Sequence, residues 1–435
     1  MNILVVTQRW YPDTFGGSEH VAAEQARRLA LRGHTVTVLT EQVKAVLPPS
    51  EASGTLTVQR YGTAEQFERF GGASRTDLEE VPKLINVILN EAKRSEGSPT
   101  NVGSAHTREI LRSAQNDKQV WDVALLHHPF PAGGFFNAGL AIPSLYLFHS
   151  STAKEVEFDG LRSNRMPSWL RPLLTRLFVM WTSRIEQGAL TRATRIAVFS
   201  DFSQSILLGM VPHAHRRVMH LLVGIDRMHF HPQDKARARA SLGLPLHKKI
   251  VLTVRRFTPR MGISRLITAM EQVLRTIPEA QLLIIGEGFL KETLVSEIQR
   301  RGLQSKVTLI GTVPLADLPL YYGAADLFVL PSEALEGLGM ATLEALACGL
   351  PVLGTPAGAT PEVLRDLDPL LITGSTSSLH IAEGIRAYFA RSEEERMNLG
   401  TRARAMVEKK YDWDRAIDEL EKILETLKHR NTVTL

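Results

Sequence analysis

The sequence is poor in cysteine and aromatic residues and has no long apolar run. Cys348 is the only cysteine among 435 residues, so a disulfide framework is excluded, and its small apolar neighbours indicate a packed, inert thiol. No stretch reaches the ~20 apolar residues of a membrane-spanning helix, because the best candidate, 169–181, contains Arg171, Pro172 and Arg176. The chain enters a strand directly, without the charged leader and apolar core of a signal peptide. We therefore expect a reducing, cytoplasmic location.

The charge balance is moderate. A formal net charge of +5, with 22% charged and 44% hydrophobic residues, is ordinary for a globular protein and does not indicate nucleic-acid binding. One segment, 161–195, combines arginines with tryptophans. Either it forms a helix packed on its domain with solvated arginines, or it makes a peripheral contact with an anionic surface at the inner face of a membrane.

Short apolar runs alternate with segments of helical period, which is typical of parallel βαβ units. The first series of expected strands comprises 2–6, 35–39, 123–126, 144–148 and 196–199; the second comprises 250–254, 282–285, 307–310, 327–330, 352–354 and 370–372. The first unit contains a helix that Ser18 opens and Gly33 ends. The pattern predicts an α/β protein with two doubly wound, Rossmann-like domains facing each other across a ligand-binding cleft.

The two series divide the chain near residue 235, where an apolar segment gives way to a charged one. We expect an N-terminal domain at 1–235, a C-terminal domain at 236–410 and a terminal helix in 411–435. Residues 92–118 are polar and lack periodicity, so we expect a mobile insertion there.

Residues 331–362 contain the strongest functional signal. An expected strand ends just before a loop in which Gly337 and Gly339 let the backbone approach a ligand closely. A helix then begins near Met340, and the free N–H groups of a helix N-terminus suit a diphosphate. Glu344 follows on this helix, where its carboxylate could accept hydrogen bonds from ribose hydroxyls. The alternative is a buried βα crossover whose glycines only permit tight packing and whose glutamates are solvated.

The same stretch carries a longer pattern: Glu336, seven residues, Glu344, then Ala-Cys-Gly-Leu-Pro-Val, then Gly358-Ala-Thr-Pro-Glu362. This pattern resembles the retaining nucleotide-sugar glycosyltransferases of family GT4, which have the GT-B architecture. The resemblance implies an acceptor-side N-terminal domain, a C-terminal domain that binds a nucleoside diphosphate sugar, and a terminal helix packed back on the first domain. It implies the following donor contacts: Gly337, Leu338, Gly339 and Met340 with the diphosphate, and Glu344 with the ribose. It also implies that Glu336 and Glu362 lie near the sugar or the cleft.

The resemblance also concerns the cations of the site. The segment 254–262 ends the first strand of the second series, where the family directs an arginine and a lysine toward the diphosphate. Arg256 matches the arginine, whereas Met261 stands in the place of the lysine and carries no charge. Arg260 or Arg255 could replace the missing cation; if the site lacks one, Met261→Lys should strengthen diphosphate binding. The alternative for this arginine cluster is a solvated loop.

Further positions match the family in both domains. His149 stands where the family places a histidine against the donor sugar; its alternative role is to cap the strand end through a backbone bond. Glu19 matches a position in the loop that approaches the donor phosphate on domain closure. The matching glycines are Gly16 and Gly17 in that loop, and Gly286 and Gly288 in the loop beneath the nucleoside.

The resemblance therefore implies a retaining glycosyltransferase that moves a sugar from a nucleoside diphosphate sugar to a sugar, polyol or lipid-linked hydroxyl. The expected catalytic residues are His149, Arg256 and Glu336, and no side chain is cast as a base, because the leaving phosphate is thought to take the acceptor's proton in such enzymes. Beyond the sugar nucleotide we expect no cofactor.

No obligatory metal is expected either. Two pairs of aspartates have the spacing of metal ligands, but we expect them to cap a turn and a helix; these are Asp366 with Asp368, and Asp412 with Asp414. His127 and His128 end another strand and could line the acceptor side, but they lack the carboxylate or cysteine partners of a metal site.

Two other functions stay open. A GT-B sugar-nucleotide epimerase or hydrolase would bind the same donor without a sugar acceptor, and a binding protein weakened at Met261 would bind donor without turnover. A dinucleotide-dependent oxidoreductase is poorly supported, since 337–342 lacks the third glycine of that fingerprint.

Overall fold

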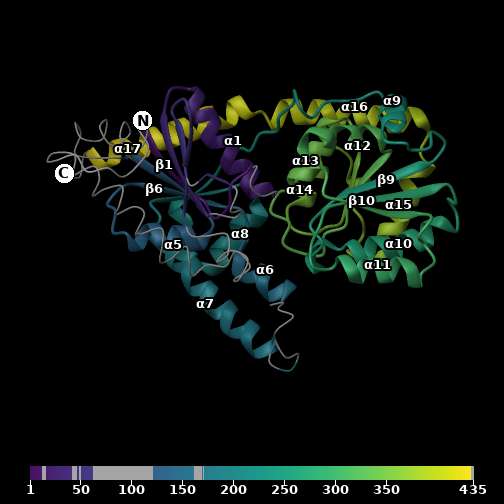
Figure 1. Cartoon of the computed structure of the whole chain (residues 1–435), viewed down its shortest axis with the longest axis horizontal. Coiled ribbons are helices and arrows are strands. Elements are labelled where there is room, and N and C mark those ends of the chain that lie inside the picture. Colours follow the sequence, from purple (N-terminus) through teal and green to yellow (C-terminus); the bar gives the residue numbers. More distant parts are fainter. Residues whose placement is uncertain are drawn as a thin grey trace.

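The computed structural model describes residues 1–11, 16–41, 47–48, 50–61, 121–160, 169 and 171–432, and the expected 92–118 insertion lies outside them. Two α/β domains stand side by side (Figure 1). Each is built on its own sheet, with eight strands in the first and five in the second. The prediction of an α/β protein with two Rossmann-like domains is confirmed.

The N-terminal sheet has the order β3-β4-β2-β1-β5-β6-β7-β8. Its strands are β1 (Asn2–Val6), β2 (Thr35–Glu41), β3 (Ser50–Ser53), β4 (Leu56–Tyr61), β5 (Val123–His127), β6 (Ser144–Phe148), β7 (Arg195–Val198) and β8 (Val218–His220). β3 pairs antiparallel with β4, whereas the other described pairs of this sheet are parallel. Alternate residues of β1 enter two hydrophobic clusters, Ile3 and Val5 in one and Leu4 and Val6 in the other. Both faces of the sheet are therefore covered, as expected for parallel strands.

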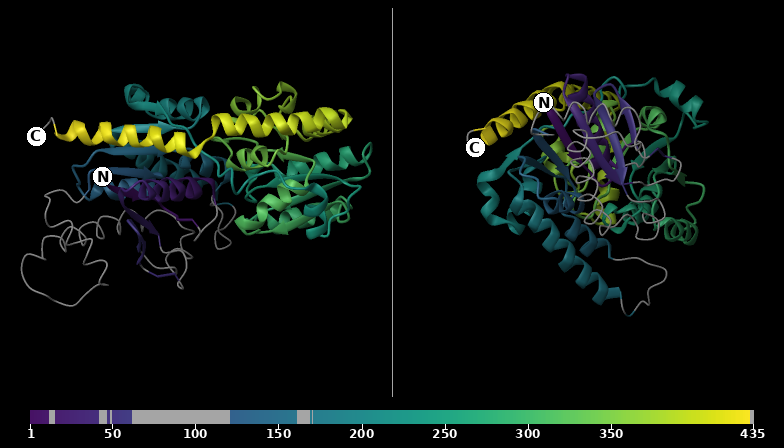
Figure 2. Two further views of the ribbon diagram at one scale, coloured as in Figure 1. Left: turned by 90° about the horizontal axis from the view of Figure 1, so that it is seen from above. Right: turned by 60° about the vertical axis from the view of Figure 1, so that its left-hand side comes forward.

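The helices of this domain are α1 (Gly17–Leu31), α5 (Pro129–Asn137), α6 (Thr152–Asp159), α7 (Arg171–Arg192) and α8 (Asp201–Met210), followed by the 3₁₀ helix η1 (Pro212–Arg217). Both α5 and α6 pack against α7. The first half of α7 projects away from the body of the domain, as Figures 1 and 2 show.

The C-terminal sheet has the order β11-β10-β9-β12-β13 and is parallel throughout its described pairs. Its strands are β9 (Lys249–Val254), β10 (Ala280–Ile285), β11 (Val307–Gly311), β12 (Leu327–Leu330) and β13 (Val352–Gly354). The surrounding helices are α9 (Lys235–Ser241), α10 (Ile263–Leu274), α11 (Lys291–Arg300), α12 (Leu318–Ala324), α13 (Met340–Ala347), α14 (Thr360–Leu364), α15 (Ser378–Ala390) and α16 (Glu393–Lys410), with 3₁₀ helices η2 (Pro259–Met261), η3 (Leu315–Asp317) and η4 (Pro369–Leu371). Cys348, at the end of α13, is buried, and burial raises the pKa of its thiol well above the usual range, which fits an inert side chain.

The last two helices run along both domains. α16 lies on the C-terminal domain, and α17 (Trp413–Thr432) continues over the N-terminal domain (Figure 2). There Arg32 pairs with Asp418 at 2.6 Å and with Glu421 at 2.5 Å, and His34 Nε2 lies 2.7 Å from Glu421. The C-terminal end of the chain is thus held by the first domain. Among the described residues, no helix is long and apolar enough to cross a membrane.

Two local expectations are wrong. Residues 370–372 are not a strand: Pro369 opens η4, the side chain of Asp368 accepts from Leu370 N–H, and only Ile372 forms an isolated bridge, with Gly354. Proline lacks the N–H that a strand ladder needs. Ser18 does not cap α1 either, because Gly16 occupies the N-cap position without a side-chain cap.

Candidate active site

The candidate site lies where the two domains meet, beyond the carboxyl ends of their parallel strands. Ser200 Oγ, at the start of α8, donates a hydrogen bond of 2.7 Å to the carbonyl of Gly337 in the C-terminal domain. A Cβ on Gly337 would stand 2.4 Å from the carbonyl oxygen of His149, and one on Gly17 would stand 3.2 Å from Cγ of Met340. Four residues expected in the site, from three separate motifs, are thus adjacent across the domain interface.

Glu336 is a buried carboxylate in the loop between β12 and α13. Its Oε2 accepts a hydrogen bond from Ser332 Oγ at 2.6 Å and pairs with the guanidinium of Arg255. Burial alone would raise the pKa of Glu336, but Arg255 and Ser332 lower it, so the side chain is charged at neutral pH. The preceding residue, Leu335, has φ of 55°. Such strain in a non-glycine residue is found mostly at functional sites.

Gly339 begins α13 beside this carboxylate. Its φ is 83°, and a Cβ there would lie 3.2 Å from Glu336 Oε1. No side-chain cap accepts a hydrogen bond from the first N–H groups of this helix, and such groups suit an anion. The segment with Gly358 and Ala359 packs against this loop, because Ala359 N–H donates to the carbonyl of Glu336 at 2.8 Å.

Glu344 lies one turn into α13. The hydroxyl of Tyr322, on α12, donates to its Oε2 at 2.7 Å, and burial raises the pKa of Glu344 to about 7. Contact with a ribose stays a prediction. Tyr322 was missed from the sequence because it stands 22 residues earlier in the chain and belongs to no motif.

Glu362 makes a contact that its motif did not indicate. Its two carboxylate oxygens accept hydrogen bonds from the backbone N–H groups of Asp201 and Phe202, both at 2.8 Å. A C-terminal-domain carboxylate therefore closes the N-terminus of α8, where negative charge is favourable. Its expected contact with the donor sugar stays a prediction.

Three histidines gather at the ends of β5 and β6. His127 Nδ1 lies 3.0 Å from His149 Nε2, and the rings of His128 and His149 stack with centroids 6.0 Å apart. Burial and His128 lower the pKa of His149 to about 3, so its imidazole is neutral. His128 has φ of 66° and, with Leu335, is one of two non-glycine residues of positive φ in the described chain.

Glu19 brings a second charged carboxylate into this region. Burial opposes its charge, but His128, Arg256 and Arg9 lower its pKa below the usual value. A Cβ on Gly16 would stand 2.2 Å from Glu19 Oε2, so this glycine is needed for the side chain to fold back over the start of α1. Glu19 and His128, from the first domain, thus share one electrostatic environment with Arg256, from the second.

The arginines after β9 have different surroundings. Arg256 is exposed, whereas Arg260 is buried and reaches α6 of the other domain, where Nη2 lies 2.7 Å from Glu155 and Nε lies 3.4 Å from Asp159. Contact of Arg260 with a donor stays a prediction, but carboxylates already hold its guanidinium. Met261 is also buried, and its sulfur lies 2.7 Å from Arg255 Nη2.

Gly286 and Gly288 support the strand end that carries these arginines. A Cβ on Gly286 would lie 1.9 Å from the carbonyl oxygen of Arg255, and one on Gly288 would lie 2.6 Å from that of Phe257. Both therefore permit close backbone packing, and their contact with a nucleoside stays a prediction.

Within the described ranges, no group of three or more histidine, cysteine, aspartate or glutamate side chains could hold a metal ion. Asp368 caps η4, and Asp412 accepts from Arg415 N–H at 3.0 Å at the start of α17. The capping roles expected for these two aspartates are confirmed.

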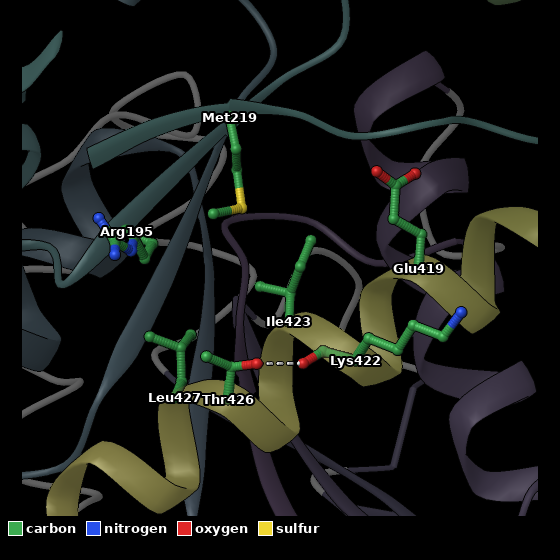
Figure 3. Close-up of a pocket in the computed structure, with 7 residues that line it drawn as sticks. All are labelled: Arg195, Met219, Glu419, Lys422, Ile423, Thr426 and Leu427. Atoms are coloured by element: carbon green, nitrogen blue, oxygen red, sulfur yellow. Dashed lines mark hydrogen bonds between the residues drawn. The ribbon is translucent and has the colours of Figure 1, made fainter. Parts of the chain in front are cut away.

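A pocket of ≈ 240 Å³ lies elsewhere, between α17 and the strands β7 and β8 (Figure 3). Its lining comprises Arg195, Met219, Glu419, Lys422, Ile423, Thr426 and Leu427. None of these residues was expected in the site, and the lining of this pocket contains no cluster of catalytic groups.

Comparison with known proteins identifies the family. The family model described as glycosyl transferases group 1 matches residues 234–406. A GDP-mannose-dependent monoacylated alpha-(1-6)-phosphatidylinositol monomannoside mannosyltransferase of Corynebacterium glutamicum is 31% identical over 81% of this chain and 89% of its own length. The chain belongs to the glycosyl transferases group 1 family. The resemblance to the GT4 enzymes is thereby confirmed.

Two further comparisons bear on length and fold. A D-inositol 3-phosphate glycosyltransferase of Segniliparus rotundus is 33% identical over 65% of this chain, and the matched region spans 62% of that relative's length. The solved structure of sucrose-phosphate synthase from Thermosynechococcus elongatus superposes with a TM-score of 0.75 at 21% identity, covering 98% of both chains. The GT-B architecture is therefore confirmed.

Proposed function

We propose that this glycosyltransferase moves a sugar from a nucleoside diphosphate sugar to an acceptor hydroxyl with retention of anomeric configuration. The observation that carries the proposal is that groups from both domains lie together at the interface. The C-terminal domain contributes the charged Glu336, the uncapped N-terminus of α13 and Arg256, and the N-terminal domain contributes the neutral His149. The Corynebacterium relative, named as GDP-mannose-dependent, supports a donor of this class.

The chemistry follows from where charge develops. As the bond between the anomeric carbon and the diphosphate breaks, its electron pair passes to the phosphate oxygen, and the sugar becomes oxocarbenium-like. The N–H groups of α13 and Arg256 would stabilise the leaving diphosphate. The acceptor oxygen would attack on the same face, and its proton would pass to the departing phosphate oxygen. A pKa of about 3 for His149 makes this imidazole a poor base, which supports a mechanism without one there.

We also propose that no metal takes part. In metal-dependent transferases a divalent cation offsets the charge of the diphosphate, whereas here cationic and N–H groups of the protein would do so. Retained turnover in excess chelator is the expected result.

The projecting part of α7 supports peripheral membrane contact. On α7, Leu173, Leu177 and Met180 are 54%, 51% and 52% exposed, and their spacing places them on one side of the helix. Trp169, two residues before the first residue of α7, is 78% exposed. Arg176 lies nearby and is exposed, while the acidic residue of α7, Glu186, is buried. An apolar stripe flanked by positive charge suits an anionic lipid surface. Flotation with anionic vesicles should recover the protein, and Leu173→Ser with Leu177→Ser should abolish that recovery without changing the fold.

A donor screen tests the proposed activity. The protein is incubated in chelator with UDP-, GDP- and ADP-sugars and a panel of sugar, polyol and lipid acceptors, and products are identified by mass spectrometry. Acceptor-dependent release of nucleoside diphosphate together with a new glycoside is expected. Free or epimerised sugar without a glycoside would favour a hydrolase or epimerase, and binding without turnover would favour a binding protein.

A further inference from the structure

Arg255 is a buried cation at the end of β9. Its side chain is 7% exposed, and Nη2 contacts three groups: Ser332 Oγ at 2.8 Å, Met261 Sδ at 2.7 Å, and the carboxylate of Glu336. These contacts fix the guanidinium against the loop that leads into α13.

Among the described residues, the rest of this guanidinium has no hydrogen-bond partner. Nε is buried without a hydrogen-bond partner, and all the side-chain hydrogen bonds that Arg255 makes within the described part of the chain come from Nη2. An arginine has five N–H donors, and leaving buried donors unsatisfied is costly. An anion that reached Nε would remove this cost, and one at Nη1 would add a charge-assisted hydrogen bond.

The position of Arg255 identifies that anion. Glu336 Oε2 pairs with Arg255, while Oε1 of the same carboxylate faces Gly339, the N-cap of α13. The carboxylate of Glu336 therefore lies between Arg255 and the helix N-terminus at which the diphosphate is proposed to bind. Arg260 also has a buried Nε without a hydrogen-bond partner, but it is a poorer candidate, because two carboxylates of the other domain, Glu155 and Asp159, already balance its charge.

We infer that Arg255 is the buried cation that binds the donor's diphosphate, with Met261 as its uncharged neighbour. The inference rests on the proposed function. It adds Arg255 as a diphosphate ligand and explains why position 261 carries an uncharged methionine. In the unliganded protein Glu336 balances the charge of Arg255. In the complex the diphosphate shares it through the unpaired N–H groups, and exposed Arg256 supplies a second cation.

This arrangement reverses the expectation for Met261. The thioether accepts an N–H of Arg255 at 2.7 Å, so a lysine at this position would set an ammonium against a guanidinium. Like charges at this distance repel strongly in a buried site. Met261→Lys should therefore displace Arg255 and weaken diphosphate binding, whereas Met261→Leu, which keeps the volume, should have little effect.

Calorimetry with paired nucleotides tests the inference. The probe is whichever of UDP, GDP and ADP binds the wild type most tightly, together with its monophosphate, and the readout is the ratio of the two affinities. Arg255→Gln should reduce diphosphate affinity about ten- to hundredfold and monophosphate affinity much less. Arg300→Gln, at an exposed arginine of α11, is the matched control and should change neither.

Because Arg255→Gln leaves Glu336 unpaired, the double variant Arg255→Gln/Glu336→Gln and Met261→Lys are measured alongside it. The inference is supported if the ratio of diphosphate to monophosphate affinity falls in Arg255→Gln, in the double variant and in Met261→Lys, and if all three keep native circular dichroism. An unchanged ratio in the folded variants, or tighter diphosphate binding by Met261→Lys, overturns it while leaving the proposed function intact. Failure of the wild type to bind any of the three diphosphates overturns both.

Discussion

At the scale of single residues, the site is defined by how its charges are balanced. Glu336 and Glu19 are buried yet remain charged, because cations and imidazoles outweigh the cost of burial. Glu344 has no such partner among the described residues: a tyrosine hydroxyl donates to it, and burial raises its pKa to about 7. His149 is held neutral by burial and a neighbouring imidazole. Each side chain is thus suited to a different part of a sugar nucleotide.

The raised pKa of Glu344 gives a pH prediction. Between its ordinary value of 4.5 and about 7, the folded protein holds a proton that the unfolded chain has released, so the free energy of unfolding falls as pH rises through this window. Ribose hydroxyls prefer the charged acceptor, so nucleotide affinity should instead rise between pH 6 and pH 8.

Glu344→Gln should abolish the rise in affinity, reduce the fall in the free energy of unfolding by the share that Glu344 contributes, and weaken nucleoside diphosphate binding by about 1–3 kcal/mol. Calorimetry at several pH values measures the affinity, and thermal unfolding at the same values measures stability. Unchanged affinity in a folded variant would show that Glu344 is not the ribose ligand.

His149 is expected to act on the sugar and not on the nucleotide. His149→Ala should lower kcat about 10²-fold or more, as for loss of one preorganised transition-state contact, while affinity for the free nucleoside diphosphate changes little. Steady-state kinetics and calorimetry on the same preparation separate the two effects. Equal losses in both would indicate a structural role at the end of β6.

The sequence predicts some of these residues and not others. Glycines and glutamates in motifs of fixed spacing, such as Gly337 and Glu336, were found because their chemistry is local. The sequence leaves Arg255 and Arg260 as equal alternatives and gives His128 no specific role, because the significance of these residues depends on partners distant in the chain. A positive φ at His128 cannot be seen in residue type.

At the scale of elements, several uninterrupted apolar runs were predictable to the residue, and others to within two residues. The bounds of β6, β12 and β13 agree with expectation, because strands buried on both faces need such runs. The edge strands β3 and β8, and β4 beside β3, were not predicted. All four residues of β3 are exposed, and β4 contains Arg60, whose charge is balanced by Glu51 at 2.7 Å on β3. Polar strands of this kind carry no continuous apolar signal.

α6 is the element that connects the domains beside the site. Its N-terminus is held by buried Glu186 of α7, which accepts from Ser151 Oγ at 2.9 Å. Near its other end Asp159 accepts from Arg260 N–H at 3.0 Å. A shift of α7 would therefore be transmitted through α6 to the loop that carries Met261.

Arg260→Ala tests this connection. Removing a guanidinium that two carboxylates hold should weaken the contact between the domains by about 1–3 kcal/mol, so the radius of gyration in small-angle scattering should increase and the KM for donor should rise. Arg265→Ala, which breaks a more exposed ion pair with Glu333 inside the C-terminal domain, is the control. An unchanged radius and KM in Arg260→Ala would mean that this ion pair does not hold the domains together.

At the scale of the whole molecule, two parallel sheets place their strand ends at one interface, and the long α16–α17 segment joins the domains on another side (Figure 2). The two-domain α/β design followed from periodicity alone. The contacts across the interface did not, because pairs such as Glu362 with Phe202 stand 160 residues apart. These contacts include the residues proposed to act on the donor from both sides.

The most direct test of the account is a crystal structure of the protein with the nucleoside diphosphate selected by the donor screen. We predict the β-phosphate within hydrogen-bond distance of the first N–H groups of α13 and of Arg256, with the ribose at Glu344. A nucleotide bound with its diphosphate directed away from α13, or bound outside the domain interface, would contradict the account.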